Sequence, residues 1–383
     1  KFKWETEFKQ TEIGEVPREW EVWKLKDLFK IESGRRPAEV NDNGKFEVWG
    51  AKGFMGYISS YNHCGEFLIT GRVGTLGHVF YIPKNIKIWA SDNALIITKN
   101  KDEAIAKFYF YHLKTRKEEI EELNVGSTQP LITQRDLKEI KVPYPSPEEQ
   151  SRIATVLSWF DDLIENKKRQ NEILEKVAMA IFKSWFVDFE PFKDEEFVYS
   201  EELGKEIPKG WEVKAIGEVV DILYGKGLPE SKRKNGSFPV VGSSGIVGYH
   251  AQFLATPPSI VIGRKGNAGS VYLMLEPFYP IDTVFYTGKT TPAITFYIYH
   301  HLKLTPLAEI GMTDTAVPGI NINNLKAVKI PIPPQPILQH FHFLVEPLFQ
   351  KIIFNQRQIM VLRKIRDALL PKLVFGKLRV EVI

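Results

Sequence analysis

Two glycine-rich basic turns are the sharpest candidates for chemistry in this chain. Gly71–Gly77 reads Gly-Arg-Val-Gly-Thr-Leu-Gly, and Gly263–Gly269 reads Gly-Arg-Lys-Gly-Asn-Ala-Gly, each directly after a short apolar run. Glycine permits a tight turn and a close approach of the backbone to a ligand. The arginine at the second position can bind a phosphate or a guanine edge through two donors. These residue types therefore indicate a nucleic-acid contact.

A structural role for the same arginines stays open. Arg72 and Arg264 could instead pair with Asp92 and Asp282, which correspond to each other further along the chain, and so brace the fold. Residues that two copies share suit scaffold or phosphate contacts, whereas residues that differ suit base reading. The sequence favours neither role over the other.

Basic and polar loops add further candidates for DNA contacts. Residues 33–37 and 224–236 are basic and contain glycine, which suits a clamp on the phosphate backbone, although solvated loop tips have the same composition. Residues 126–130 and 312–318 offer small polar groups that could equally be satisfied within turns. The candidate DNA-binding residues are Arg35, Arg36, Lys52, Arg72, Thr75, Ser127, Thr128, Gln129, Lys226, Lys232, Arg233, Lys234, Ser243, Ser244, Arg264, Lys265, Asn267, Thr313 and Thr315.

Recognisable catalytic motifs are absent from the sequence. It contains no phosphate loop of the Walker type, no nucleophile elbow and no His-Glu-x-x-His zinc motif. His63 and Cys64 are adjacent, but no second pair completes a metal site. We therefore expect a chain that is non-catalytic by itself and that binds no metal or cofactor of its own.

Composition limits the class of protein. The chain has 383 residues, of which 43% are hydrophobic and 26% charged, as in ordinary soluble globular proteins. Its formal net charge is only +4, so any basic footprint for nucleic acid must be local. The single cysteine, Cys64, excludes a disulfide framework and fits a reducing cytoplasm. No apolar run reaches the roughly 18 residues of a membrane span.

An internal repeat divides the chain into two similar halves. The glycines and tyrosine of Gly50–Tyr57 recur at the same spacing in Gly242–Tyr249, and Leu137–Pro143 resembles Leu325–Pro331. A period of about half the chain is far too long for a solenoid. It predicts two tandem copies of one domain.

Each copy begins with a mixed α/β segment. Apolar runs at 67–70 and 259–262, bounded by turn residues, predict strands. Residues 102–123 and 292–304 predict short helices.

A long amphipathic helix follows each proline-rich end of these segments. Between Glu148 and about Phe189 there is no glycine or proline, and apolar residues recur every three or four positions. The second copy has a similar helix, which Pro347 and Pro371 are expected to kink or shorten.

The two helices are expected to pair with each other. Antiparallel pairing would place the polar middles, 166–171 and 355–358, opposite each other and fix the register, as a buried Asn does in a coiled coil. The candidate residues for helix–helix or subunit contacts are Ile153, Leu157, Phe160, Ile164, Leu174, Ile181, Trp185, Leu344, Leu348, Ile352, Ile359 and Leu362.

These elements predict an α/β (α+β) protein with internal pseudo-two-fold symmetry. Two homologous mixed α/β domains are separated by two long antiparallel, coiled-coil-like helices, each about 60 Å long, which would hold the domains a fixed distance apart. The predicted boundaries are 1–147 and 196–335 for the α/β domains, and 148–195 and 336–383 for the helical regions.

An ordered set of short motifs resembles a known family. Gly14, Pro17 and Trp20 form a Gly-x-x-Pro-x-x-Trp opening, 126–130 reads Gly-Ser-Thr-Gln-Pro, and 140–153 runs from Ile-Lys-Val-Pro to Pro-Glu-Glu-Gln-Ser-Arg-Ile. With the duplicated domain-plus-helix order, the chain resembles, over almost its whole length, the specificity subunit of a type I DNA restriction-modification system.

The resemblance implies a function and a set of partners. Each α/β domain would be a target recognition domain that reads one half of a bipartite sequence in double-stranded DNA. The helices would set the gap and dock two modification (methyltransferase) subunits, which restriction (endonuclease/translocase) subunits then join. S-adenosylmethionine, ATP and Mg²⁺ would be used by those partners in the cytoplasm, away from any membrane.

Two other functions stay open. A tandem-repeat adaptor that binds proteins or glycans, with no DNA role, is compatible with glycine-rich and aromatic loops. A fused enzyme with an unfamiliar site is disfavoured because neither copy holds a reactive set. Salt-dependent binding to duplex DNA separates the first of these from the DNA-reading function.

Overall fold

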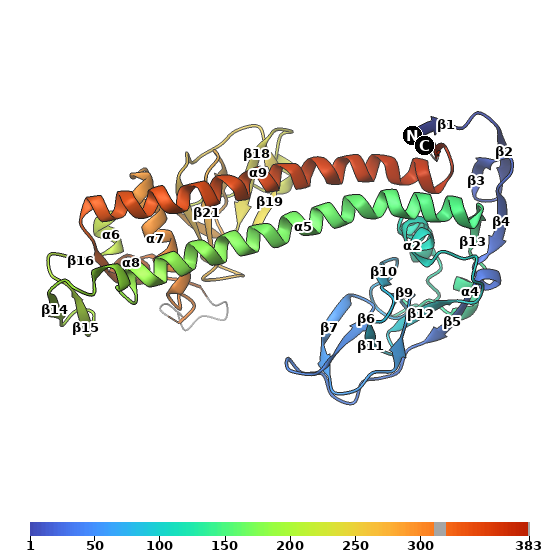
Figure 1. Cartoon of the computed structure of the whole chain (residues 1–383), viewed down its shortest axis with the longest axis horizontal. Coiled ribbons are helices and arrows are strands. Elements are labelled where there is room, and N and C mark those ends of the chain that lie inside the picture. The colour runs from blue at the N-terminus through green and yellow to red at the C-terminus, as the bar shows by residue number, and fades with distance from the viewer. Residues whose placement is uncertain (310–318, 382–383) are drawn as a thin grey trace. The chain divides into compact units, whose positions relative to one another are not determined.

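The computed structural model describes residues 1–309 and 319–381, and its contacts divide the chain into two compact units (Figure 1). Unit 1 combines residues 1–166 with 358–383, and unit 2 comprises 167–357. Each long helix therefore contributes one half to each unit. The predicted division into two α/β domains and two helical regions stays a prediction. The contacts group each α/β segment with one half of each long helix, and they do not divide the chain by function.

Unit 1 is built on two four-stranded sheets. Their strand orders are β10-β9-β12-β5 and β7-β6-β11-β8. Their strands are β5 (Phe29–Ser33), β6 (Phe46–Gly50), β7 (Gly53–Ile58), β8 (His63–Cys64), β9 (Phe67–Gly71), β10 (Val79–Ile82), β11 (Lys87–Ala90) and β12 (Ala94–Lys99). Two-stranded pairs are formed by β1 (Phe2–Trp4) with β25 (Leu378–Val380), β2 (Phe8–Thr11) with β3 (Gly14–Pro17), and β4 (Glu21–Lys24) with β13 (Lys141–Tyr144).

Four short helices belong to unit 1: α1 (Leu25–Leu28), α2 (Ala106–Lys114), α3 (Lys117–Glu122) and α4 (Gln134–Lys138). The single helix expected over 102–123 is wrong in extent, because the structure has α2 and α3 with a break between them. Thr115 donates its hydroxyl to the carbonyl of His112 (2.7 Å), and this local bond competes with continuation of the helix.

Unit 2 repeats the strand order of unit 1, with three strands instead of four in its second sheet. Its sheets have the orders β17-β23-β20-β21 and β19-β18-β22. The strands are β17 (Ile222–Tyr224), β18 (Phe238–Gly242), β19 (Gly245–His250), β20 (Ser259–Gly263), β21 (Val271–Met274), β22 (Tyr279–Pro280) and β23 (Val284–Thr287). Two-stranded pairs are formed by β14 (Phe197–Ser200) with β15 (Lys205–Pro208), and β16 (Glu212–Ala215) with β24 (Lys329–Ile332). The expected strands at 67–70 and 259–262 are confirmed as β9 and β20.

The helices of unit 2 are α6 (Ile216–Val219), α7 (Pro292–Leu304) and α8 (Ile322–Ala327), with 3-10 turns at Glu190–Phe192 and Glu230–Lys232. The expected helix over 292–304 is confirmed. The Thr291 hydroxyl caps the amide of Ile294, and Pro292 fits the first turn because its missing N–H would have no partner there.

The long helices are α5 (Pro147–Phe186) and α9 (Gln335–Val374), each of 40 residues. The expectation that Pro347 and Pro371 would shorten the second helix is wrong, because α9 continues through both positions. Val345 and Phe349, two residues before and after Pro347, are both buried. No described helix is long and apolar enough to cross a membrane.

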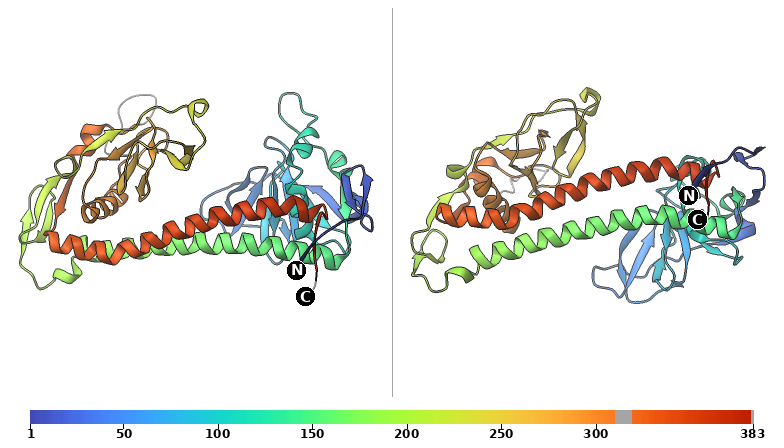
Figure 2. Two further views of the ribbon diagram at one scale, coloured as in Figure 1. Left: turned by 90° about the horizontal axis from the view of Figure 1, so that it is seen from above. Right: turned by 45° about the horizontal axis from the view of Figure 1, so that its top comes forward.

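Within each unit the halves of α5 and α9 run antiparallel (Figure 2). In unit 1 the Asp161 carboxylate accepts hydrogen bonds from Arg366 (2.5 Å) and from the Tyr111 hydroxyl (2.6 Å), which ties α5 to α9 and α2. In unit 2 the Asn355 amide donates to Asn171 (2.9 Å). The expected polar contact between the helix middles is therefore confirmed in unit 2.

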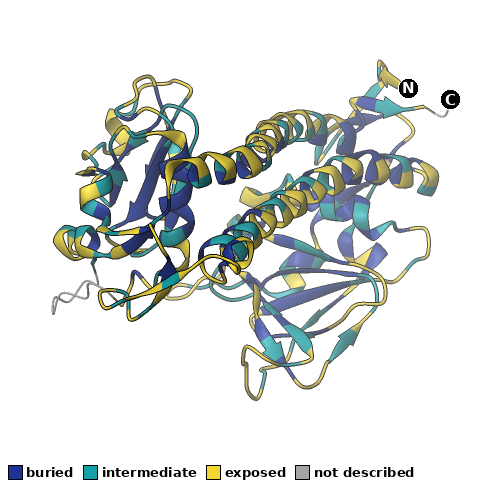
Figure 3. Cartoon of the chain, turned by 60° about the vertical axis from the view of Figure 1, so that its left-hand side comes forward, coloured by how far each residue is buried: buried dark blue, intermediate teal, exposed yellow. Residues whose placement is uncertain are grey.

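Each long helix has buried and exposed faces (Figure 3). The buried residues differ in part from the predicted stripe. Among the predicted residues Ile153, Leu157, Ile164, Ile352 and Ile359 are buried, and Phe160, Leu174, Ile181, Trp185, Leu348 and Leu362 are half-buried. Leu344 is exposed, so it does not contribute to packing inside unit 2. Phe182 and Phe186 are fully buried there, each one position after a predicted residue, Ile181 or Trp185, and Phe341 is fully buried as well.

Two histidines of α7, His300 (buried) and His301 (half-buried), should make unit 2 sensitive to acid. Burial lowers the pKa of His300 to about 4 and that of His301 to about 3. In the unfolded chain both bind a proton near pH 6.5, so the folded state binds fewer protons below that pH. We expect the free energy of unfolding to fall by about 1.4 kcal/mol per pH unit for each histidine between pH 6.5 and the folded-state pKa.

Urea unfolding of unit 2 between pH 7.5 and 4.5 measures this loss. His301→Gln should roughly halve the slope, because glutamine does not titrate and its amide can still bond the Tyr297 hydroxyl, now 2.9 Å from His301. An unchanged slope in that variant would contradict the assignment.

Candidate nucleic-acid interface

Five loops of unit 1 meet at one end of its sheets. These are residues 33–36, the β6–β7 turn at 50–53, the glycine–arginine turn at 71–77, the turn at 91–93 and the loop at 124–131. We call them the loop cluster of unit 1. Backbone hydrogen bonds join them, from Arg35 to Ala90 (2.9 Å), Ser91 to Trp49 (2.8 Å), Arg72 to Asn93 (2.8 Å) and Gly74 to Pro130 (2.9 Å).

Unit 2 has a corresponding loop cluster, formed by residues 224–229, 242–245, 263–269, 281–283 and, among those described, 319–320. Three of the bonds correspond directly: Lys226 donates to Pro280 (3.0 Å), Ile281 to Val241 (2.9 Å) and Arg264 to Thr283 (2.9 Å). Ile320 also donates to Arg264 (3.1 Å), as Ile132 donates to Arg72 (2.8 Å) in unit 1. The same scaffold therefore presents two sets of loops. The sequence did not indicate the central role of the 91–93 and 281–283 turns, because they act through backbone carbonyls.

Glycine is required at the start of both glycine–arginine turns. A Cβ atom on Gly71 would collide with the carbonyl oxygen of Thr75, and one on Gly263 would collide with that of Asn267. The turn closes this tightly only without a side chain. This closeness holds the following arginine at the edge of the loop cluster.

The arginines of these turns do not pair with carboxylates. Arg72 donates to the backbone carbonyl of Asp92 (3.3 Å), and the Arg264 guanidinium stacks over Tyr224 (5.0 Å) and Phe285 (5.7 Å). Among the described residues neither makes an ion pair within 4.0 Å. The bracing alternative through the carboxylates of Asp92 and Asp282 is therefore not the observed arrangement, and most guanidinium donors remain available.

The other candidate DNA-binding residues fall into three groups. Ser127, Thr128, Gln129, Arg35, Arg36, Lys52, Lys226, Lys232, Lys234, Ser244, Lys265 and Asn267 are exposed, and Thr75 is half-buried. Ser243 is buried, and Arg233 donates to the carbonyl of Val247 (2.7 Å), so both serve the fold of unit 2. Thr313 and Thr315 lie outside the described residues.

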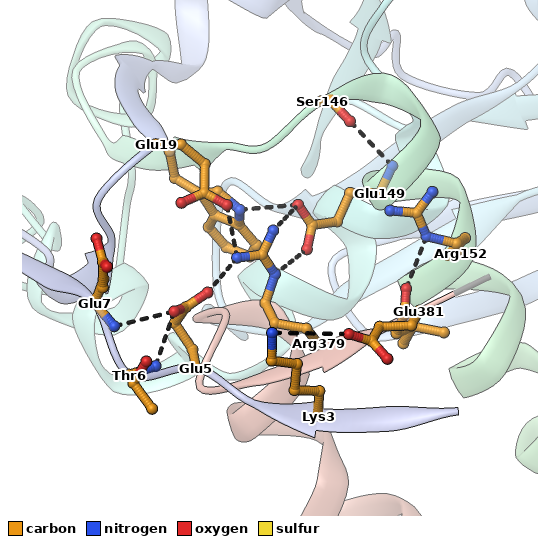
Figure 4. Close-up of polar contacts among 12 residues, drawn as sticks. Lys3, Glu5, Thr6, Glu7, Glu19, Ser146, Glu149, Arg152, Arg379 and Glu381 are labelled. Atoms are coloured by element: carbon orange, nitrogen blue, oxygen red, sulfur yellow. Dashed lines mark hydrogen bonds and ion pairs between the residues drawn. The ribbon is translucent and has the colours of Figure 1, made fainter. Parts of the chain in front are cut away.

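The start of α5 shows what the Pro-Glu-Glu-Gln segment does (Figure 4). Glu149 accepts hydrogen bonds from the Trp20 indole (3.0 Å) and from Arg379. Gln150 accepts from the amide of Ile105 (2.9 Å) and donates to the carbonyl of Pro145 (2.9 Å). The segment thus fastens the α/β part of unit 1 to its helix.

Metal-binding chemistry has no support in the described part of the chain. No group of three or more His, Cys, Asp or Glu side chains there could hold an ion. His63 is half-buried and faces Asn62 (2.7 Å), while Cys64 is exposed.

Comparison with known proteins gives consistent matches. Residues 17–176 and 208–359 match the family model described as type I restriction modification DNA specificity domain. The chain is 40% identical to the type I restriction enzyme MjaIX specificity subunit of Methanocaldococcus jannaschii, over 100% of this chain and 98% of that protein. It is 22% identical to the HindI specificity subunit of Haemophilus influenzae, over 88% and 92% of the two chains.

One solved structure has the same fold. The crystal structure of the type I restriction-modification S subunit from M. genitalium aligns with a TM-score of 0.62 at 23% identity. The alignment covers 95% of this chain and 97% of that one.

Proposed function

This chain belongs to the type I restriction-modification DNA specificity family, and we propose that it directs such a complex to a bipartite DNA target. Unit 1 and unit 2 each read one half of the target. The long helices set the gap between the halves and dock the modification subunits, to which restriction subunits are added. The chain itself is non-catalytic, and its partners use S-adenosylmethionine, ATP and Mg²⁺.

The observation that carries this proposal is the duplicated loop cluster. Both units build it from the same strands and the same backbone hydrogen bonds, yet the exposed side chains differ. Lys52 of unit 1 corresponds to Ser244 of unit 2, and Val73 corresponds to Lys265. A shared scaffold with different exposed groups suits two readers of different sequences, because base contacts carry the specificity.

Exposed apolar side chains on the long helices support the docking of partner subunits. Trp159 and Leu163 are exposed on α5 in unit 1, and Phe343 and Phe354 are exposed on α9 in unit 2. Apolar groups that gather on a soluble surface mark interaction sites. We assign these residues to contacts with the modification subunits.

The test is assembly with the cognate modification subunits, followed by methylation of genomic DNA and mapping of the modified bases. A split motif with a constant gap is the expected result. Assembly without a split motif would contradict two-half reading. Absence of any complex, together with no salt-dependent binding to duplex DNA, would favour the adaptor function instead.

Arg72→Ala and Arg264→Ala should each weaken binding of the assembled complex to its mapped duplex about 5- to 100-fold. Each should also reduce the slope of log affinity against log salt by about one, because each removes a cationic contact. Arg18→Ala, which removes an exposed arginine outside the loop clusters, is the matched control and should leave both quantities unchanged. Unaltered DNA affinity with a less stable unit would restore the bracing role.

A further inference from the structure

Both units contain a β-hairpin with a bulge at the same place. In unit 1, β6 pairs Val48 with Gly56 and then Trp49 with Phe54, so Met55 is the extra residue. In unit 2, β18 pairs Val240 with Gly248 and then Val241 with Ile246, so Val247 is the extra residue. The two units therefore share this β-bulge as well as the regular strands.

The bulge exposes two consecutive apolar side chains in each hairpin. Neighbouring residues of a regular strand face opposite sides of the sheet, so one of each pair would face inward. Here Phe54 and Met55 are 49% and 47% exposed, and Ile246 and Val247 are 55% and 40% exposed. A bulge re-aims side chains in this way, and it often lies beside a binding site.

The bulges are held by specific contacts. Glycine with positive φ stands on both sides of each pair, at Gly53 (99°) and Gly56 (134°) in unit 1. Asn41 exchanges two backbone hydrogen bonds with Tyr57 there, of 2.9 and 2.7 Å.

In unit 2 the support comes from a side chain. The Arg233 guanidinium donates to the carbonyl of the extra residue Val247 (2.7 Å). The two bulges are therefore held by different contacts, whereas both hairpins expose a pair of apolar side chains.

Each hairpin is part of its loop cluster. The carbonyl of Ser243, in the β18–β19 turn, accepts hydrogen bonds from Ser270 (2.7 Å) and Tyr272 (3.1 Å), next to the glycine–arginine turn. In unit 1 a Cβ on Gly71 would lie 3.3 Å from the Cβ of Ala51 in the β6–β7 turn. The apolar pairs therefore lie directly beside the loop clusters that contain Lys52 and the turn arginines.

We infer that each hairpin enters a groove of the DNA duplex and that its bulged pair contacts base edges there, with the thymine 5-methyl group as the apolar partner. This rests on the proposed function. A two-stranded β-ribbon fits the major groove, where thymine presents its methyl group. The cationic side chains of the same loop cluster complement the phosphates on either side. The pairs differ, Phe-Met against Ile-Val, as two readers of unlike half-sites require.

The test uses the assembled methyltransferase complex and two double variants, Phe54→Ala with Met55→Ala, and Ile246→Ala with Val247→Ala. Each variant should relax the mapped motif only in the half that its own unit reads. Its affinity for the mapped duplex should fall about 10- to 100-fold, the usual cost of a lost base contact. The salt slope should stay unchanged, because no charge is removed.

Uracil in place of thymine in the mapped half-site removes only the methyl groups. It should weaken wild-type binding and leave the binding of the matching double variant unaltered. Ile86→Ala in unit 1 and Val198→Ala in unit 2 remove exposed apolar groups of other elements, and they should change neither half of the motif.

The outcomes separate this inference from the proposed function. A wild-type complex without a split motif would overturn the proposed function itself. A normal wild-type motif that both double variants retain in full would overturn the hairpin inference alone. Loss of assembly with the modification subunits would also overturn it, because the hairpins would then contact protein.

Discussion

Replacing Arg379 by alanine is expected to lower the free energy of unfolding of unit 1 by about 3 to 5 kcal/mol. Its guanidinium contacts the carboxylates of Glu5, Glu19 and Glu149 (Figure 4). The side chains of Glu149 and Arg379 are only 5% and 19% exposed. Alanine would leave a buried carboxylate without its cation, and such a charge costs far more than a lost surface pair.

Arg379 also supports the pairing of the two terminal strands. It lies in β25, which pairs with β1, and Glu5 directly follows β1. We therefore expect the variant to lose hydrogen-exchange protection in β25 and at the start of α5 first.

Hydrogen exchange and urea unfolding, both resolved for unit 1, measure the effect. Arg18→Ala is the control, because it removes an exposed arginine whose ion pair with Glu7 spans 3.9 Å, and it should cost less than about 1 kcal/mol. Arg379→Met combined with Glu149→Gln should recover most of the loss, since no buried charge remains. A loss in Arg379→Ala no greater than in the control would contradict the argument.

Replacing Phe182 by alanine is expected to cost unit 2 about 3 to 5 kcal/mol. Phe182 is fully buried on α5, and its ring lies 5.0 to 5.8 Å from the rings of five residues. These are Phe186, Tyr297, His300, His301 and Phe341. Alanine would leave a cavity where α5, α7 and α9 meet, and closely packed rings cannot collapse into it.

Ile181→Ala is the matched control, because Ile181 is the neighbouring residue on α5 and is only half-buried. It should cost less than half as much as Phe182→Ala in urea unfolding of unit 2. In the assembled complex, Phe182→Ala should impair the half of the motif that unit 2 reads before the other half. Equal costs for the two variants would show that the core is centred elsewhere.

The repeat and the long helices could be inferred without coordinates. Glycine spacing and the matched ends of the two copies predicted two domains of one topology, and the structure has them. A period of three to four over about 40 residues predicted α5 and α9 within two residues at their starts. Such features depend on local sequence, so they can be recognised along the chain.

Which face of a helix is buried depended on neighbours far away in the chain. Ile181 and Phe182 are both apolar, and helical spacing does not choose between adjacent apolar residues. Phe182 is the buried residue of the two, because its ring packs against aromatic rings of α7 and α9. Likewise, Pro347 was expected to kink or shorten the second helix, but α9 continues through it to Val374.

The candidate site, too, could be predicted from the sequence only in part. Its glycine–arginine turns were visible because glycine and arginine are informative residue types. The bulges at Met55 and Val247 were not, because a bulge is a property of two paired strands and not of one sequence segment. The same holds for Arg379 and Glu149, which are far apart in the chain and meet only because β25 folds back onto the start of α5. Charge pairing acts over a few ångströms in space, and linear distance along the chain carries no information about it.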